Sequence, residues 1–263
     1  MSITDMPTAL VSAAVFLLGA AIGSFLNVCI YRLPLGRSIV TPGSACPACG
    51  HAIRWFENIP ILSFILLRAR CSACNRPISI RYPFVELLMG ILAVAVWQKF
   101  PFQIDFLIYL VFCAAMLVIT FIDLDHMIIP DIISLPGIAM GFAVSFISNH
   151  MDWEQSLMGI LLGGGLFYAV AFIFCLITKK EGMGGGDIKL LAMIGAFLGW
   201  QAVLFVIFVS AFVGAVVGLI YTRIYSNDKN AQIPYGPFLA GAAICYLFYG
   251  QIIIAWYINL FIA

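Results

Sequence analysis

The sequence predicts an all-α polytopic membrane protein with about eight transmembrane helices and one small soluble insertion. Of its 263 residues, 63% are hydrophobic and only 10% are charged, and the mean hydropathy is +1.09. These values lie far outside the range of soluble domains. Apolar stretches suited to a hydrocarbon core of about 30 Å recur along most of the chain. The segment 33–83 is the only sizeable polar interruption.

Eight apolar stretches are the expected spans. The first is kept as a helix because it lacks both the basic leader and the cleavage pattern of a signal peptide. The second and sixth are too short to cross alone, so we expect them to be extended by neighbouring residues, to be half-helices, or to border a cavity. In chain order the expected spans are 8–31, 84–97, 105–122, 132–147, 156–177, 188–198, 202–221 and 238–261.

The positions of the basic residues predict the orientation. Lys and Arg concentrate in the cytoplasmic loops of membrane proteins. With the amino terminus outside, the inside loops hold every one of the 13 Lys and Arg residues except Lys99. The segment 33–83 is therefore expected in the cytoplasm. The net charge of +1 gives no indication of nucleic-acid binding.

Two cysteine pairs, CPAC (46–49) and CSAC (71–74), lie in the soluble segment. Their spacing is close to that of a zinc ribbon, in which Cys46, Cys49, Cys71 and Cys74 would hold one tetrahedral Zn²⁺. A segment this small buries little surface, so a metal would stabilise its fold. Disulfides or free thiols are the alternative, but disulfides need an oxidising compartment. The other four cysteines lie in apolar spans and are expected to behave as small core residues.

Four acidic residues lie at membrane boundaries: Asp123, Asp125, Asp131 and Asp187. A single such residue can simply anchor the interface, and Asp131 is placed to cap the next helix. The predicted topology brings the end of the third span, at Asp123, and the start of the sixth, at Asp187, to the same cytoplasmic face. Two neighbouring carboxylates cannot both ionise easily, so such a pair can act as acid and base on one water molecule, as in an aspartic protease.

Residue pattern alone leaves one choice open. Asp125 points about 200° away from Asp123 on a helix, so only one of them should face Asp187. Asp187 begins a helix, where the macrodipole favours the anion, and Asp123 ends one, where its proton is favoured. We therefore expect Asp187 to be the base and Asp123 the acid. Lys189 is expected to meet a lipid phosphate or a structural partner.

The run GMGGGD (182–187) precedes the sixth span. Glycine permits tight turns and close backbone approach. Gly184 and Gly186 are therefore expected to let a peptide lie alongside Asp187 in extended form.

Ordered motifs cover almost the whole chain. Besides the two cysteine pairs they are GSFLNVCIYRLP (23–34), ENIPILSF (57–64), ISIRYPFVELL (78–88), FIDLDHMIIPD (121–131) and GMGGGDIKLLAMIGAFLGW (182–200). In these motifs the chain resembles the type IV prepilin peptidases, the bifunctional leader peptidases and N-methyltransferases of type IV pilus and type II secretion systems.

The resemblance implies that Asp123, rather than Asp125, pairs with Asp187, and that Gly184, Gly186 and Asp187 form the GxGD signature of intramembrane aspartic proteases. It implies a bacterial inner-membrane enzyme whose substrates are prepilins or pseudopilins already in the bilayer. The leader is removed at the cytoplasmic face, typically between Gly and Phe. The new amino terminus is then methylated from S-adenosylmethionine. Membrane lipid is an expected partner, nucleic acid is not, and the oligomeric state stays open.

The expected domains are a first helix (1–32), the four-cysteine segment (33–83) and a membrane-embedded peptidase domain (84–263). No glycine-rich Rossmann fingerprint follows a strand, so the methyl-donor site is expected in or beside 33–83. The family usually has Gly where Ala69 stands, so we expect this loop to turn differently. Further residues match the family and could line a site or stitch the segment to the membrane helices: Asn27, Glu57, Asn58, Arg81, Tyr82 and Glu86.

Two other classes of function fit part of the pattern. A small transporter also uses short helices broken by glycine, but it would place its site near mid-membrane and leaves the cysteine pairs unexplained. An assembly protein could use a zinc ribbon to bind a partner. Assaying cleavage, ion flux and binding separates the three.

Overall fold

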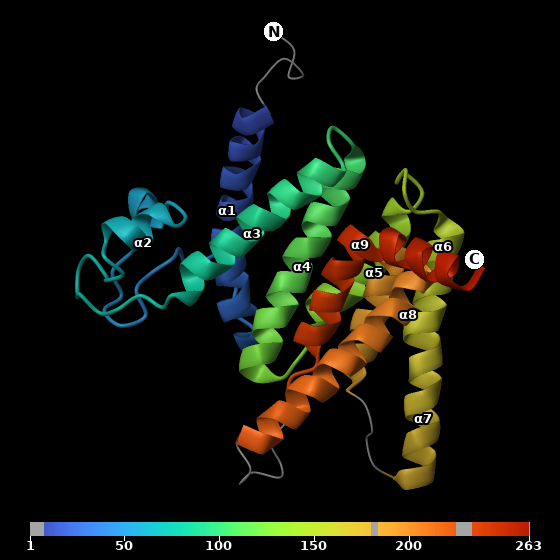
Figure 1. Cartoon of the computed structure of the whole chain (residues 1–263). Coiled ribbons are helices and arrows are strands. Elements are labelled where there is room, and N and C mark those ends of the chain that lie inside the picture. Colours follow the sequence, from blue (N-terminus) through green and yellow to red (C-terminus); the bar gives the residue numbers. More distant parts are fainter. Residues whose placement is uncertain (1–7, 180–183, 225–232, 263) are drawn as a thin grey trace. The chain divides into compact units, whose positions relative to one another are not determined.

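Helices make up nearly all of the regular structure. The structure, a computed structural model of the chain, describes residues 8–179, 184–224 and 233–262. Within these ranges there is no β-strand, only two isolated bridges. The all-α prediction is therefore confirmed. Residues up to Val118 form one compact unit and residues from Ile119 form a second (Figure 1).

In the first unit, α1 (Thr8–Arg32) packs against α3 (Arg81–Lys99). Small residues make this contact close, because a Cβ on Gly19 would lie 2.8 Å from the carbonyl oxygen of Met89 and one on Gly23 would lie 2.7 Å from Cα of Glu86. Glycines four residues apart are a common means of bringing two membrane helices together. Figure 1 shows the two helices side by side.

The soluble segment leaves the membrane after α1 and returns at α3. It contains three short helices, η2 (Leu33–Leu35), η3 (Trp55–Asn58) and α2 (Leu62–Leu66). The bridges Ala45–Ala52 and Arg70–Pro77 each close a turn that carries one cysteine pair. The segment is thus built from two small turns and a short helical connection.

The second unit is organised around α8, which packs against α5, α6, η4 and α9. The helix α4 begins in the first unit and ends in the second. The bounds are α4 (Ile104–His126), α5 (Asp131–Val144), α6 (Trp153–Ile160), the π-helical turn η4 (Leu161–Leu166), α7 (Phe167–Thr178), α8 (Gly185–Ile224) and α9 (Gly236–Ile262).

Glycines also set the packing around α8. Gly159 of α6 and Gly195 of α8 face each other so closely that a Cβ on either would overlap the other's backbone carbonyl. A Cβ on Gly141 of α5 would lie 2.7 Å from Cβ of Ala196. The first half of α8 is consequently held by two neighbouring helices at near-minimal separation.

The predicted spans are present, but the sixth and seventh both lie within α8. Helix α8 is interrupted at Gly199, whose φ of 81° and ψ of 175° are not helical. This break separates the predicted spans 188–198 and 202–221, which therefore follow one another without a loop. The second span is longer than predicted, since α3 has 19 residues.

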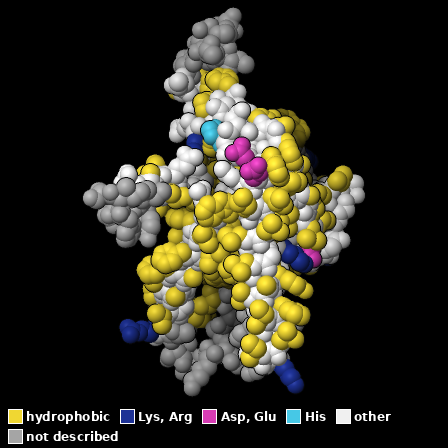
Figure 2. All heavy atoms as spheres, turned by 90° about the vertical axis from the view of Figure 1, so that its right-hand side faces the viewer, with side chains coloured by type: hydrophobic (Ala, Val, Ile, Leu, Met, Phe, Trp, Pro, Cys, Tyr) yellow, Lys and Arg dark blue, Asp and Glu magenta, His cyan; other side chains and the backbone are white. Residues whose placement is uncertain are grey.

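Six helical segments of the described chain are long and apolar enough to cross a membrane, and α5 is a shorter apolar helix. The six are Thr8–Leu35, Arg81–Lys99, Ile104–His126, Trp153–Thr178, Gly185–Tyr221 and Gly236–Trp256. With α5 and the division of α8 at Gly199, they account for the eight predicted spans. The face drawn in Figure 2 is covered largely by hydrophobic side chains, as expected for a multi-pass membrane protein.

Candidate active site and metal centre

A cavity of about 690 Å³ in the second unit contains both aspartates singled out in the sequence. Asp123 comes from the last turn of α4 and Asp187 from the first turn of α8. Their charges are near enough to interact. The remaining lining residues are Met127, Ile128, Ile129, Asp131, Gly184, Gly185, Gly186, Ile233, Pro234 and Tyr235. Two carboxylates from different helices thus face one space large enough for a short peptide segment.

Asp123 is held by the start of α9. Its side chain is buried, with the residue 5% exposed, and its Oδ2 accepts a hydrogen bond from the backbone N–H of Gly236 at 2.8 Å. The first N–H groups of a helix have no partner within the helix, so the N–H of Gly236 is available to one oxygen of this carboxyl group. Beside this contact, the hydroxyls of Tyr235 and Ser210 are hydrogen-bonded to each other at 2.7 Å. This bond joins the start of α9 to α8.

Asp187 is held by the glycine-rich turn. Its backbone N–H donates to the carbonyl oxygen of Gly184 at 3.1 Å. A Cβ on Gly184 would lie 3.1 Å from Oδ2 of Asp187, and a Cβ on Gly186 would lie 3.0 Å from Cβ of Ile129. Neither glycine has a left-handed backbone. Close approach, rather than an unusual turn, is therefore the reason for glycine at these two positions.

The other two boundary aspartates have different environments. Asp125 is exposed and does not line the cavity. Nζ of Lys189 donates to both carboxylate oxygens of Asp131, at 2.7 and 2.8 Å. The expectation that Asp131 caps α5 is wrong, because Asp131 is the first residue of that helix and uses its carboxylate for Lys189. Of the two partners expected for Lys189, the structure shows the structural one.

Sequence reasoning missed the residues 233–236 altogether. They supply one wall of the cavity and the N–H group that contacts Asp123. A signal was present, since PYGP (234–237) places a glycine between prolines at the start of an apolar span, a pattern typical of a constrained turn.

In the first unit, the four predicted cysteine ligands converge. The sulfur atoms of Cys46, Cys49, Cys71 and Cys74 all lie within 4.8 Å of one another, and all four thiols are free of disulfides. Sγ of Cys46 and Sγ of Cys74 are 3.9 Å apart. Ligands about 2.3 Å from a tetrahedral zinc lie about 3.8 Å from each other. The cluster is therefore close to the arrangement that a tetrahedral metal ion needs.

The two cysteine turns share one backbone pattern. The N–H of Gly50 donates to the carbonyl oxygen of Cys46 at 2.9 Å, and the N–H of Asn75 donates to that of Cys71 at 3.0 Å. Gly50 and Asn75 each follow the second cysteine of a pair and have a positive φ, 73° and 57°. Both cysteine pairs are thus presented in the same way.

Backbone N–H groups inside these turns favour thiolates. Those of Ala48 and Cys49 lower the pKa of Cys46 to about 6. Those of Cys74 and Ala73 likewise lower the pKa of Cys71. Because the thiolate is the form that binds a metal, the first cysteine of each pair is favoured as a ligand.

His51 joins the two turns rather than serving as a fifth ligand. Its Nε2 lies 3.2 Å from Oε2 of Glu57 and 3.3 Å from Oγ of Ser72, one of the two residues between the second pair of cysteines. The hydroxyl of Ser72 and the backbone N–H of Arg54 lower the pKa of Glu57 to about 2. Glu57 is therefore ionised, and its carboxylate connects His51, Ser72 and Arg54 within the soluble segment.

Two of the residues that match the family, Asn27 and Glu86, make hydrogen bonds near the junction of the soluble segment and the helices α1 and α3. Nδ2 of Asn27 in α1 donates to the carbonyl oxygen of Tyr82 at 3.1 Å, at the start of α3. The buried Glu86 of α3 accepts the backbone N–H of Ile61 at 2.7 Å. The first bond joins α1 to α3, and the second ties the middle of the soluble segment to α3.

The sequence predicted a different turn at Ala69, because the family usually has glycine there, but the structure has a left-handed turn at this residue. Ala69 keeps a left-handed backbone, with φ of 57°, and Arg68 before it has φ of 51°. The N–H of Ala69 donates to the carbonyl oxygen of Phe64 at 2.8 Å, and its own carbonyl accepts from Ile78 at 2.8 Å. These two bonds hold alanine in a conformation that glycine would adopt with less strain.

Comparison with known proteins agrees with the layout of both units. Residues 17–100 match the bacterial peptidase A24 N-terminal domain, and residues 110–219 match the type IV leader peptidase family. A prepilin leader peptidase/N-methyltransferase of Aeromonas hydrophila is 38% identical, covering 94% of this chain and 94% of the relative.

The chain belongs to the prepilin leader peptidase/N-methyltransferase family. A family member of Stutzerimonas stutzeri is also 38% identical, over 96% of this chain and 95% of its own. Another, of Myxococcus xanthus, is 44% identical over 78% of this chain, which spans 61% of that longer relative. No solved structure matches the chain. Both cavity aspartates fall in the peptidase match and all four clustered cysteines fall in the N-terminal match.

Proposed function

We propose that this protein removes the leader from prepilins or pseudopilins and methylates the amino terminus that cleavage exposes. The observation that carries the peptidase half is the placement of Asp123 and Asp187 in one cavity, in a chain of the prepilin leader peptidase/N-methyltransferase family. The methyltransferase half follows from the names of full-length relatives and from the cysteine cluster in the matched N-terminal domain.

In the proposed hydrolysis, Asp187 is the base and Asp123 the acid. The carboxylate of Asp187 takes a proton from water as the water oxygen bonds to the scissile carbonyl carbon, and Asp123 gives its proton to the carbonyl oxygen. When the C–N bond breaks, the electron pair leaves with nitrogen, which receives the proton that Asp187 took from water. A hydroxyl proton of the intermediate returns to Asp123, so both carboxyl groups regain their starting states. The hydrogen bond from Gly236 engages Oδ2 of Asp123, which leaves Oδ1 to hold the transferable proton.

In the proposed methylation, the cleaved pilin supplies a neutral amine and S-adenosylmethionine supplies the methyl group. The amine lone pair forms the N–C bond, the S–C bond breaks, and its electron pair stays on sulfur as a neutral thioether. The extra proton on nitrogen passes to solvent. We assign zinc to Cys46, Cys49, Cys71 and Cys74 because their sulfur spacing suits it and because the pKa values of Cys46 and Cys71 are lowered. This metal has a structural role, because four thiolates leave no open position.

The positions of the basic residues support an inner-membrane protein with both sites at the cytoplasmic face. Lys99 alone falls on the opposite side in the eight-span topology. A prepilin already inserted in the bilayer would present its polar leader at this face. Membrane lipid therefore surrounds both enzyme and substrate.

The test is cleavage by purified protein in detergent, with a prepilin as substrate. We expect Asp123→Asn and Asp187→Asn each to lower the rate roughly 10³-fold or more, because both proton transfers are needed. Asp125→Asn is the matched control. Asp125 lies two residues after Asp123 in α4, but its carboxylate is exposed and does not line the cavity. Retained turnover in either of the first two variants rules out the dyad.

Methylation measured in parallel on a pilin cleaved beforehand separates the two halves of the function. Both aspartate variants are expected to methylate this substrate at the wild-type rate. Ion flux in vesicles without any cleavage would instead support a transporter, and binding without turnover would support an assembly protein.

A further inference from the structure

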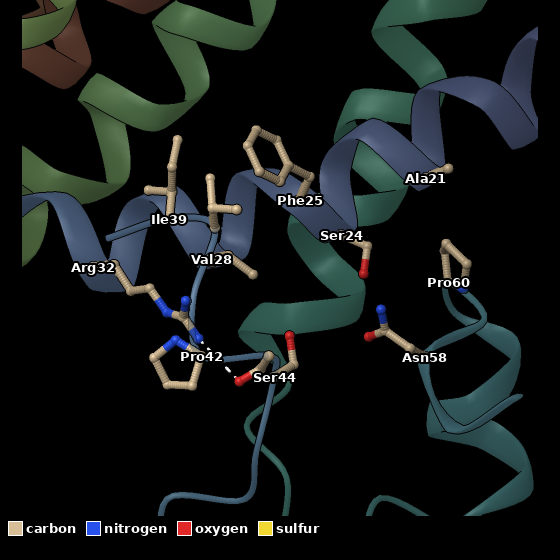
Figure 3. A pocket seen from close by; sticks show the side chains of 12 residues that line it. Ala21, Ser24, Phe25, Val28, Arg32, Ile39, Pro42, Ser44, Asn58 and Pro60 are labelled. Atoms are coloured by element: carbon tan, nitrogen blue, oxygen red, sulfur yellow. Dashed lines mark hydrogen bonds between the residues drawn. The ribbon is translucent and has the colours of Figure 1, made fainter. Parts of the chain in front are cut away.

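A second cavity, of about 310 Å³, lies wholly within the first unit (Figure 3). One wall is α1, through Ala21, Ser24, Phe25, Val28 and Arg32. The other wall is the soluble segment, through Ile39, Val40, Pro42, Gly43, Ser44, Asn58 and Pro60. The volume is at the lower end of the range for small-molecule sites, roughly 300–1,000 Å³. The cavity therefore suits one compact ligand at the boundary between membrane and water.

The polar groups of this cavity stand at opposite ends. Figure 3 shows Arg32 at one end and Ser24 and Asn58 at the other, with the hydroxyl of Ser44 between them. Nη1 of Arg32 donates to the carbonyl oxygen of Ser38 at 3.0 Å, and Nη2 donates to that of Gly43 at 3.2 Å. A guanidinium has about five N–H donors, so these two bonds fix its position and leave donors for a ligand. No acidic side chain lines the cavity, which favours an anionic group at Arg32.

Apolar side chains fill the space between the polar ends. Phe25 and Val28 of α1 line this middle part, and Pro42 of the facing loop lies beside Arg32 (Figure 3). Such a combination suits a ligand with a flat, weakly polar body and a carboxylate at one end. Hydroxyl and amide groups at Ser24 and Asn58 can bond to hydroxyls at the other end.

The two walls are fixed to each other by a buried carboxylate. Glu86 accepts the N–H of Ile61 at 2.7 Å and the hydroxyl of Ser24. Ile61 has a φ of 62°, which is strained for a β-branched residue. The loop that carries Asn58 and Pro60 is thus held against α1, and the cavity is preformed.

We propose that this cavity binds S-adenosylmethionine, with its carboxylate at Arg32 and its adenine against Phe25 and Val28. The inference rests on the proposed methyltransferase function. It places the donor beside α1 at the membrane boundary, where a pilin helix would bring its new amino terminus. A lipid phosphate shares the anionic chemistry that Arg32 selects, but it has no flat body to fill the middle of the cavity.

The experiment measures binding of S-adenosylmethionine to the full-length protein by calorimetry, in nanodiscs of phosphatidylcholine. Val28→Phe fills the cavity and Arg32→Gln removes its cation. Each is expected to weaken binding at least tenfold. Leu17→Phe is the matched control, because it adds a similar ring on an exposed position of α1 outside the cavity. The melting temperature of each variant shows that the protein is folded.

The outcomes separate the site from the function. If the wild type binds the donor and both cavity variants bind it equally well, the site is elsewhere, although the protein can still be a methyltransferase. If the wild type neither binds nor methylates, the proposed methyltransferase function itself fails.

A second arm repeats the measurement in phosphatidylglycerol. Unchanged donor affinity in this anionic lipid supports the proposal. Loss of donor binding that Arg32→Gln relieves would instead identify a headgroup site and overturn it.

Discussion

The backbone N–H of Gly236 donates to Oδ2 of Asp123 over 2.8 Å, although the two residues are 113 positions apart in the chain. This bond joins the end of α4 to the start of α9 and selects one carboxylate oxygen of Asp123. It also brings residues 233–235 to the cavity wall. The last helix is therefore part of the candidate peptidase site as well as of the membrane core.

Gly236→Ala is expected to lower leader cleavage by about 10- to 100-fold. The added Cβ would lie 2.8 Å from Oδ2 and 3.1 Å from Cγ of Asp123, so the carboxylate must move, and small displacements of a reacting group reduce rates on this scale. Gly241→Ala is the matched control in the same helix, since a Cβ there meets nothing within 4 Å. Initial cleavage rates of both variants test this, and equal rates would show that Asp123 needs no such restraint.

Gly195→Ala is expected to destabilise the second unit by about 1–3 kcal/mol, the usual effect of overpacking. Its Cβ would overlap the backbone carbonyl of Gly159, and neither backbone can yield without moving α6 from α8. Thermal unfolding in detergent measures the change. At Gly165, where a Cβ would meet nothing within 4 Å, the same substitution should leave the melting temperature within a degree or two of wild type. A similar loss at both sites would contradict the packing argument.

Removing the metal is expected to unfold the soluble segment while the membrane helices persist. Wild type should contain one zinc per chain, and Cys46→Ser should lose most of it because one of four converging thiolates is gone. Cys175→Ser is the control, as it removes an exposed thiol in α7 outside the cluster. Elemental analysis gives the zinc content, and chelator should make the cluster cysteines react with maleimide. Full zinc occupancy in Cys46→Ser would exclude the four-thiolate site.

Ala69→Gly is expected to stabilise the soluble segment by about 0.5–1 kcal/mol. Glycine relieves the left-handed strain of Ala69, and this gain exceeds the entropy that glycine adds to the unfolded chain. Ala52→Gly, at a position without a positive φ, should destabilise the segment by a similar amount. Because folding and metal binding are coupled, zinc competition with a chelator measures both changes. A weaker zinc affinity in Ala69→Gly would show that the turn is not strained.

The positions of the membrane helices could be read from the sequence because the bilayer imposes a length on every apolar stretch. The same reasoning could not show that the predicted spans 188–198 and 202–221 follow one another without a loop, since that depends on the non-helical backbone angles of Gly199. The cysteine cluster was also readable, because metal geometry restricts how four thiolates can be spaced. The bonds from His51 to Glu57 and Ser72 were not, because they depend on how the two turns meet.

The sequence by itself determined the class of protein, the cysteine set and Asp187, because each depends on composition, short spacing or the order of membrane crossings. Residue pattern left Asp125 as a rival to Asp123, and only the family resemblance decided between them. Only the tertiary structure decided that Asp131 pairs with Lys189 instead of capping its helix, and that Gly236 holds Asp123. It also decided that Gly184 and Gly186 are needed for space rather than for a left-handed turn. The physical reason is that these contacts join residues far apart in the chain, and their distances are set by helix packing, which no local pattern encodes.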